Sequence, residues 1–403
     1  MRQIRLVSLL VAAVVAAACG STGGGGTSGN SYSGKTIKLG AVLSITGAGG
    51  VYGPQSRDGM LLAIDQINKA GGVNGAKIAL TVKDDASLQA QSQAVAQTMI
   101  SSDLDLALLG PTLSNSAVAV HPLAESLKTP ILAVSTTGIH IVPDCNFPNT
   151  AACRYVFRDS LGEETAIPDN IQSYVADAHP ATSVLLVAQD DKFSSDGGKI
   201  VQDTIAKHPE YNLSLLKTYK FNKAEADLSP YVDPAVALHP DVIFITSLGG
   251  IPAKIMIEAG KQGFKGQFLG GNGFNTATVS KNAGAAGLGA RSGSAWYLGN
   301  SFPSNHDFVT AFQTMYGHDP DQFSAQGYTA IKILADAAGR ANLTFSDLAG
   351  DRDKLRAAME TVNIQTPLGP FQFTQTHDVK QTVWIIKMDG AGGFSLVHEI
   401  KPS

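Results

Sequence analysis

Residues 36–68 contain an apolar run, a glycine-rich loop and an amphipathic segment, in that order. The run over residues 37–43 is nearly all aliphatic, which indicates a strand covered on both faces. Four glycines between Gly47 and Gly53 let the following loop turn sharply and let another molecule approach its main chain. From Pro54 the apolar residues adopt helical spacing, with Met60, Leu61, Ile64 and Ile67 on one face, and Gly71-Gly72 ends the helix. The sequence thus predicts a strand, a binding loop and a helix.

A dinucleotide-binding unit is one alternative for this stretch. It needs G-x-G-x-x-G directly before the helix and an acidic residue at the end of the next strand. Asp84 and Asp85 do end the expected second strand, KIALTVKDD. The glycine spacing fits poorly, because the ring of Tyr52 would stand where the pyrophosphate must lie. A loop that is merely flexible is the other alternative.

The alternation of strands and helices continues along the chain. Four apolar strands alternate with helices up to residue 135, and a second series follows from about residue 163 to residue 270. This order is typical of parallel, doubly wound sheets, and 403 residues are enough for two domains. Three late helices and the short strands FQF and TVWIIKM then suggest that the chain crosses between two lobes more than once. We expect an N-terminal lobe of residues 36–157 plus 296–375 and a C-terminal lobe of residues 158–295 plus 376–403.

The first 18 residues have the features of a signal peptide. Arg2 and Arg5 precede an apolar stretch too short to span a hydrocarbon core of ~30 Å. The end of this stretch, AAACG, resembles the lipobox of bacterial lipoproteins, which would make Cys19 the lipidated N-terminus and residues 19–35 a Gly/Ser-rich tether. We expect an extracytoplasmic protein anchored to the bacterial cell membrane by lipid, with ordinary secretion as the alternative.

Two cysteines remain in the body of the chain, Cys145 and Cys153. Outside the cytoplasm their close spacing suits a disulfide around a small loop, and a two-cysteine metal site is the weaker alternative because nothing supplies further ligands. A formal net charge of −4 gives no basic excess for nucleic acid. Neither G-x-S-x-G nor H-E-x-x-H occurs, so we expect no hydrolase, no catalytic residue, no metal and no cofactor.

Polar side chains follow several of the expected strands. Tyr52 follows the first strand, Ser114 the third, and Ser135, Thr136 and Thr137 the fourth. Ligands of open α/β sheets bind beyond the carboxyl ends of the strands, so these residues are candidates for binding. Ser114 comes just before a helix, where its hydroxyl could help to hold an anion or could simply cap the helix.

Several motifs resemble one known family. The lipobox-like signal peptide, IKLGAVLSITGAGGVYG, INKAGGVNGAKIALTVKDDAS, GPTLSNS and ILAVSTT are similar to segments of the substrate-binding lipoproteins of branched-chain amino-acid ABC importers, which are leucine-binding-protein-like. The likeness runs from about residue 37 to the C-terminus. It implies a type I periplasmic-binding-protein fold, with two Rossmann-like lobes, parallel central sheets and a hinge of three crossovers. It also implies a monomer that closes on a small-molecule ligand and presents it to the importer's permease.

The resemblance implies ligand-binding roles for particular residues. Position by position, they are Tyr52, Ser114, Ser135, Thr136, Thr137, Phe193, Leu248, Asn272 and Phe323. The second lobe departs from the family pattern, because Phe193 and Leu248 stand at tyrosine positions and Asn272 replaces the glutamate that meets the ligand's ammonium group. An amide cannot neutralise a buried ammonium, which is expensive to leave unpaired.

Two consequences of this departure stay open at this point. Either another acid such as Asp190 or Asp191 turns inward, although a solvated loop is the favoured interpretation of these two, or the ligand has no ammonium group. The expected ligand is therefore a branched-chain or related amino acid, with an amine-free organic or aromatic acid or an amide as the alternative. A ligand sensor that contacts a signalling partner instead of a permease is a further alternative.

Overall fold

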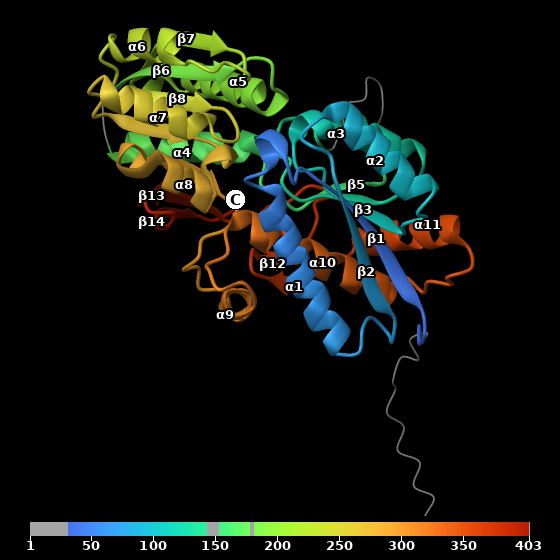
Figure 1. Cartoon of the computed structure of the whole chain (residues 1–403). Coiled ribbons are helices and arrows are strands. Elements are labelled where there is room, and N and C mark those ends of the chain that lie inside the picture. Colours follow the sequence, from blue (N-terminus) through green and yellow to red (C-terminus); the bar gives the residue numbers. More distant parts are fainter. Residues whose placement is uncertain (1–30, 143–152, 178–180, 403) are drawn as a thin grey trace, which may run out of the picture.

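The computed structural model describes residues 31–142, 153–177 and 181–402. It has two α/β lobes, each built on its own sheet (Figure 1). The signal peptide, Cys19 and Cys145 lie outside the described residues. Two lobes with parallel central strands confirm the expected fold class, whereas the exact lobe boundaries stay a prediction.

The sheet of the N-terminal lobe has five parallel strands in the order β2-β1-β3-β4-β5. They are β1 (Thr36–Leu43), β2 (Lys77–Asp84), β3 (Ala107–Leu109), β4 (Ile131–Ala133) and β5 (Val156–Arg158). The helices between them are α1 (Gly53–Lys69), α2 (Gln89–Ser101) and α3 (Ser114–Ser126). The strands β3 and β4 are buried throughout, which accounts for their unbroken apolar sequence.

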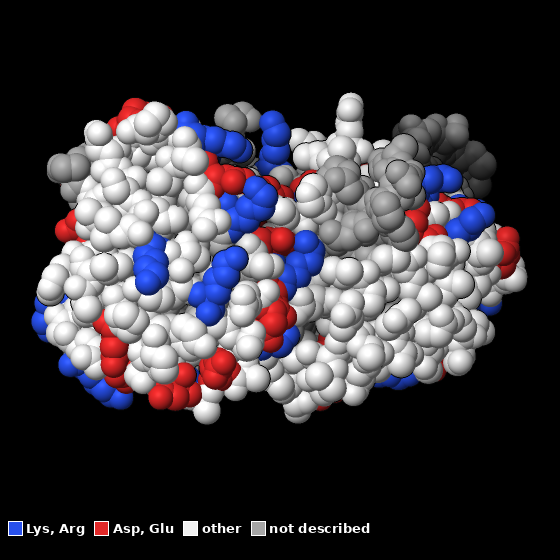
Figure 2. Space-filling model, turned by 90° about the horizontal axis from the view of Figure 1, so that it is seen from above, with Lys and Arg blue, Asp and Glu red and all other residues white. Residues whose placement is uncertain are grey.

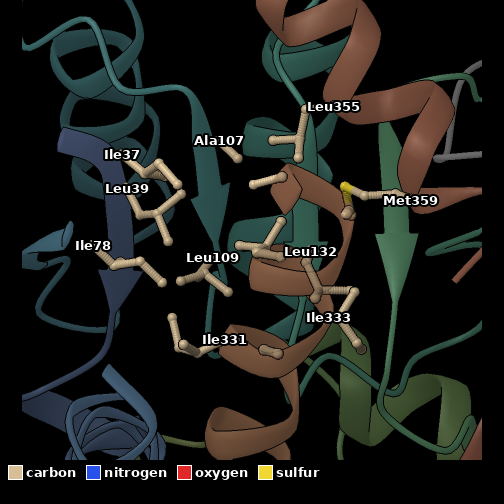
Figure 3. Close-up of a cluster of buried hydrophobic side chains, with 14 of the residues drawn as sticks. Ile37, Leu39, Ile78, Ala107, Leu109, Leu132, Ile331, Ile333, Leu355 and Met359 are labelled. Carbon is tan, nitrogen blue, oxygen red and sulfur yellow. The ribbon is translucent and has the colours of Figure 1, made fainter. Parts of the chain in front are cut away.

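Two late helices complete the core of this lobe. They are α10 (Gln322–Arg340) and α11 (Leu348–Met359), and α9 (Pro303–Tyr316) precedes them. Ile331 and Ile333 of α10 and Leu355 of α11 lie beside Leu39 of β1 and Leu132 of β4 (Figure 3). Segments almost 300 residues apart in the sequence therefore share one hydrophobic core.

Helices α1 and α10 cross at two glycines. A Cβ atom on Gly59 would lie 1.9 Å from the carbonyl oxygen of Ser324, and one on Gly327 would lie 2.1 Å from that of Ser56. Any side chain at either position would force the helices apart. The close crossing positions the first turn of α10 beside the first turn of α1.

The sheet of the C-terminal lobe has seven strands in the order β14-β13-β10-β9-β8-β6-β7. They are β6 (Ala181–Ala188), β7 (Leu213–Phe221), β8 (Val242–Thr246), β9 (Gln267–Gly270), β10 (Arg291–Ser294), β13 (Val383–Met388) and β14 (Phe394–Ile400). Its helices are α4 (Glu163–Asp177), α5 (Lys192–Lys207), α6 (Ser229–Val236), α7 (Ile251–Lys261) and α8 (Ala277–Ala283). The strands β6 to β10 are parallel, but β13 pairs antiparallel with both β10 and β14. The chain returns to this lobe as a hairpin, which adds an antiparallel edge to the parallel sheet.

Between the two lobes, one buried arginine connects two crossing segments. Arg158, at the end of β5, is 1% exposed and forms ion pairs with Asp378 and with Glu164 of α4. Strands β11 (Ile364–Thr366) and β12 (Gly369–Phe371) form a short hairpin, and Asp378 lies in the segment that leads from this hairpin to β13. The arginine therefore connects the segment where the chain first passes from one lobe to the other with the segment where it last does so.

The surface carries few charges relative to its area. Seen from above, lysines and arginines are interspersed with aspartates and glutamates, and broad uncharged areas separate them (Figure 2). This agrees with a composition of 16% charged residues. No helix in the described part of the chain is long and apolar enough to cross a membrane.

Candidate functional site

A small cavity lies where the carboxyl ends of the strands from the two sheets meet. The open space within it is about 10 Å³, room for about one water molecule, so the side chains that line it lie close together. Nine residues line it: Tyr52, Thr112, Leu113, Ser114, Ser135, Phe193, Leu248, Asn272 and Phe323. Seven of the nine expected binding residues are among them, and Thr136 and Thr137 lie buried next to Ser135.

Two aspartates hold the loop before α1 in place: Asp84, the last residue of β2, and Asp85, which follows it. The carboxylate of Asp84 accepts hydrogen bonds from the backbone of Ile45 and Thr46, and that of Asp85 accepts one of 2.7 Å from the hydroxyl of Ser44. Both acids are thus occupied in shaping the loop, so neither is placed as a ribose acceptor. This removes the main support for the dinucleotide interpretation.

Tyr52 links this loop to the other lobe. Its hydroxyl accepts a hydrogen bond of 2.9 Å from the backbone N–H of Gly249 and donates one of 3.0 Å to the carbonyl of Gly273. Burial raises the pKa of Tyr52 well above its usual range, so the phenol stays protonated. Its ring packs against Phe323 of α10, with 4.8 Å between the ring centroids. The two aromatic rings form one apolar wall of the cavity.

Ser114 is the first residue of α3, and its side chain does not cap the helix. Leu113 occupies the capping position without a side-chain bond, while the hydroxyl oxygen of Ser114 accepts a hydrogen bond of 3.2 Å from the backbone N–H of Gly138. Of the two alternatives for Ser114, the plain helix cap is therefore wrong. Ser114 lines the cavity, and its hydroxyl proton is left available because the oxygen only accepts from Gly138; the first N–H groups of a helix likewise have no partner in the preceding turn.

The three hydroxyls after β4 are less available than their sequence suggests. Ser135 donates its proton to the carbonyl of Thr112 at 2.7 Å, and Thr137 donates to Glu163 at 3.2 Å. The hydroxyl of Thr136 is buried and has no partner within the described residues. The hydroxyl protons of Ser135 and Thr137 are therefore used within the protein, and their backbone groups are what they can offer to a ligand.

The second lobe contributes three residues, each after a different strand. Phe193 lies in the first turn of α5 after β6, Leu248 follows β8, and Asn272 follows β9. Phe193 and Asn272 are buried, at 4% and 7% exposure, and Leu248 is partly buried. None of the described residues lining the cavity has an ionisable carboxylate or an amine. The walls are thus uncharged from both lobes.

The comparisons with known proteins agree with this arrangement. Residues 36–393 match the model of a family described as periplasmic binding protein. The chain belongs to this family. A leucine-, isoleucine-, valine-, threonine- and alanine-binding protein of Pseudomonas aeruginosa is 21% identical over 87% of this chain and 89% of its own length.

Solved structures show the same fold. A branched-chain amino acid transporter substrate binding protein of Streptococcus pneumoniae, in complex with isoleucine, matches with a TM-score of 0.80 and 21% identity over 91% of this chain and all of its own. A solute binding protein of an ABC transporter from R. palustris, in complex with benzoate, matches with a TM-score of 0.79 and 21% identity over 91% and 97% of the two chains. The family match makes this chain a periplasmic binding protein, and the relatives named here are binding proteins for small molecules.

Glu163 is a buried acid of the site that was not expected from the sequence. It begins α4 and is fully buried, and one carboxyl oxygen accepts hydrogen bonds from the backbone N–H of Asn272 at 2.7 Å and from the hydroxyl of Thr137. Burial raises its pKa to about 8, against the lowering effect of these bonds. The other oxygen has no partner within the described residues. Sequence analysis missed this acid because Glu163 reads as an ordinary first-turn residue of a helix.

Another contact between the lobes involves Asp191, one of the two acids that the sequence offered as partners for an ammonium group. Asp190 is exposed and accepts a backbone hydrogen bond from Lys223, whereas Asp191 is buried and caps α5. Asn115 of α3 donates to Asp191 at 2.9 Å and accepts from the backbone N–H of Lys192 at 2.7 Å. The solvated-loop expectation is thus wrong for Asp191, but neither aspartate lines the cavity.

Proposed function

We propose that this protein captures a small carboxylate-bearing molecule between its two lobes and delivers it to the permease of an ABC importer. It would do so outside the cytoplasm, on the surface of the bacterial cell membrane, as a monomer anchored through a lipid on Cys19. The observation that carries the proposal is the cavity itself, which combines the N-terminus of α3 at one end with aromatic and aliphatic walls.

The N-terminus of α3 supports a carboxylate at this end of the ligand. Its free backbone N–H groups and the hydroxyl of Ser114 are hydrogen-bond donors, and the helix dipole favours negative charge at this position. Hydrogen bonds to a charged acceptor are worth about 1.5–3 kcal/mol each. A carboxylate can therefore be held without a cationic side chain.

The walls support an apolar body on the ligand. Tyr52, Leu113 and Phe323 form one hydrophobic cluster, and Leu248 packs against it. Isoleucine and benzoate, the ligands of two structural neighbours, each combine a carboxylate with such a body. We therefore propose a branched-chain or related amino acid, or else an amine-free acid or an amide of similar size.

A binding screen tests the carboxylate. We expect at least one branched-chain amino acid, 2-oxo acid or small aromatic acid to raise the melting temperature, since a ligand that binds the folded state stabilises it. Ser114→Ala should weaken every such ligand by about tenfold or more, whereas Ser126→Ala, at the exposed far end of α3, should not. Absence of binding by all carboxylates, or equal affinity of both variants, would overturn the proposal.

Two further experiments address location and transport. If Cys19 carries the lipid, Cys19→Ser should release the protein from the membrane fraction of the producing bacterium. If the protein is secreted without a lipid, the substitution should not change the fraction in which it is found. Cells lacking the protein should lose uptake of the radiolabelled ligand found in the screen. Normal uptake together with a lost transcriptional response would instead identify a ligand sensor.

A further inference from the structure

A buried hydrogen-bond network fixes the orientation of the Gln322 side chain. Gln322 begins α10, and its Oε1 atom accepts hydrogen bonds from the backbone N–H of Ala295 at 2.7 Å and from the hydroxyl of Ser294 at 2.7 Å. A backbone N–H can only donate, so the atom it contacts must be the carbonyl oxygen of Gln322. The amide nitrogen of Gln322 must then point the other way.

This orientation determines the orientation of Asn272 in turn. The amide nitrogen of Gln322 donates to the side chain of Asn272, which must therefore present its oxygen to Gln322. The NH2 group of Asn272 is directed to the opposite side, where it lies 3.5 Å from the carbonyl oxygen of Ser135. Asn272 and Ser135 both line the cavity, whereas Gln322 does not. An amide NH2 group has two N–H donors, so one is left for a ligand in the cavity when the other is directed to Ser135.

A donor at this position disfavours an ammonium group on the ligand. An ammonium has three donors and no acceptor, so it would face the NH2 group of Asn272 without a hydrogen bond and would lose its hydration. No described residue that lines the cavity has a carboxylate to offset the charge. The nearby acid Glu163 is held largely protonated at neutral pH by its burial, so it supplies no full negative charge.

We propose that the ligand carries a hydrogen-bond acceptor, and not an ammonium group, where it meets Asn272, and that Gln322 sets this preference without touching the ligand. The ligand class is then an amine-free carboxylic acid with a second oxygen, such as a 2-oxo or 2-hydroxy acid. This inference rests on the proposed function, since it assumes that a small carboxylate occupies the cavity.

Paired ligands that differ in one group test the wild-type protein. Isothermal titration calorimetry with leucine and with 4-methyl-2-oxopentanoate compares the same carboxylate and apolar body with and without the ammonium group. We expect the 2-oxo acid to bind at least tenfold more tightly and without release of a proton. Tighter binding of leucine, with a proton released from Glu163, would overturn the inference while leaving the proposed function intact.

Substitution of Gln322 tests the network at a distance from the ligand. In Gln322→Glu one carboxylate oxygen can keep the bonds from Ala295 and Ser294, while the other becomes an acceptor facing Asn272. The Asn272 amide should then rotate and present its oxygen to the cavity, so the preference for the 2-oxo acid over leucine should fall at least tenfold. Gln322→Met, of similar size but without an acceptor, serves as the matched control and should change the preference less.

A second variant covers the case in which a buried glutamate prevents folding. Asn272→Asp can still accept from Gln322 and turns its second oxygen towards the cavity, so it too should shift the preference towards leucine. An equal loss of both ligands in all three variants would show that Gln322 has only a structural role and would overturn the inference. If no carboxylate binds the wild-type protein, the proposed function is wrong, and the inference about Asn272 and Gln322 is wrong with it.

Discussion

The hydroxyl of Tyr52, from the loop after the first strand of one lobe, lies 2.9 Å from the backbone nitrogen of Gly249 in the other lobe. The same hydroxyl donates to the carbonyl of Gly273, so one side chain satisfies two backbone groups across the cleft. A residue that forms a wall of the cavity therefore also joins the lobes. We therefore expect Tyr52 to couple ligand binding to closure of the lobes.

Replacement of Tyr52 by phenylalanine should weaken binding by about tenfold. The ring remains as a wall, but two hydrogen bonds are lost and the N–H of Gly249 is left unpaired in the closed form, at a cost of about 1–3 kcal/mol. Calorimetry with the ligand found in the screen measures the change. Tyr316→Phe is the control, because that hydroxyl bonds to Asp58 within one lobe. Equal affinities of both variants would contradict the role of the hydroxyl.

Ligand should make the protein more compact, and Asn115 should contribute to this closure. Asn115 bonds to both Asp191 and the backbone of Lys192 only when α3 and α5 are close together. Small-angle scattering should show a smaller radius of gyration with ligand, and Asn115→Ala should need several-fold more ligand for the same change. Gln97→Ala, on the exposed face of α2, should behave as wild type. An unchanged radius despite demonstrated binding would argue against closure.

The stability of the fold should decrease between about pH 5 and pH 8 because of Glu163. Burial raises its pKa in the folded protein to about 8, above the ordinary value of 4.5, so the folded state holds a proton that the unfolded state releases. The resulting stability is present at low pH and is lost as the pH rises through 8, at up to ~1.4 kcal/mol per pH unit.

Glu163→Gln should remove this contribution and flatten the profile. Glutamine keeps an oxygen that accepts the N–H of Asn272, so the local structure should survive. Denaturant unfolding of both proteins at several pH values measures the difference in slope. Asp321 has a raised pKa of about 6 and is present in both proteins, so its effect cancels. Parallel profiles would show that Glu163 is ionised in the folded state.

Cys145 and Cys153 should form a disulfide. Cys153 is buried beside α2 and α3, and export through the signal peptide would expose both cysteines to oxidising conditions. Alkylation of the unfolded, unreduced protein followed by peptide mass mapping should leave both thiols unlabelled, and reduction before alkylation should label both. Labelling of both without reduction would exclude the bond.

Much of the architecture was evident from local patterns in the sequence. The aliphatic strands and amphipathic helices have distinct periods, so their order predicted two α/β lobes. Short strands were harder to recognise, and β10, with the sequence RSGS, was missed because it has no apolar pattern. Leu61 was another local failure of the helical pattern, since it is 40% exposed while Leu62 packs beside Trp296. Helix α1 is covered on two sides, and a single apolar face does not describe it.

The sequence alone also placed Tyr52 and Ser114 at strand ends, where ligands of α/β sheets bind, because strand ends follow from local order, and the family resemblance added Asn272. It did not show which hydrogen bonds these side chains make. Glu163 meets Asn272 across 109 residues, and Gln322 meets it across 50, so only the folded chain brings them together. Burial then raises the pKa of the acid and leaves the amide one permitted orientation. The polarity of the cavity is a property of the tertiary structure, because it depends on which donors and acceptors are shielded from water together.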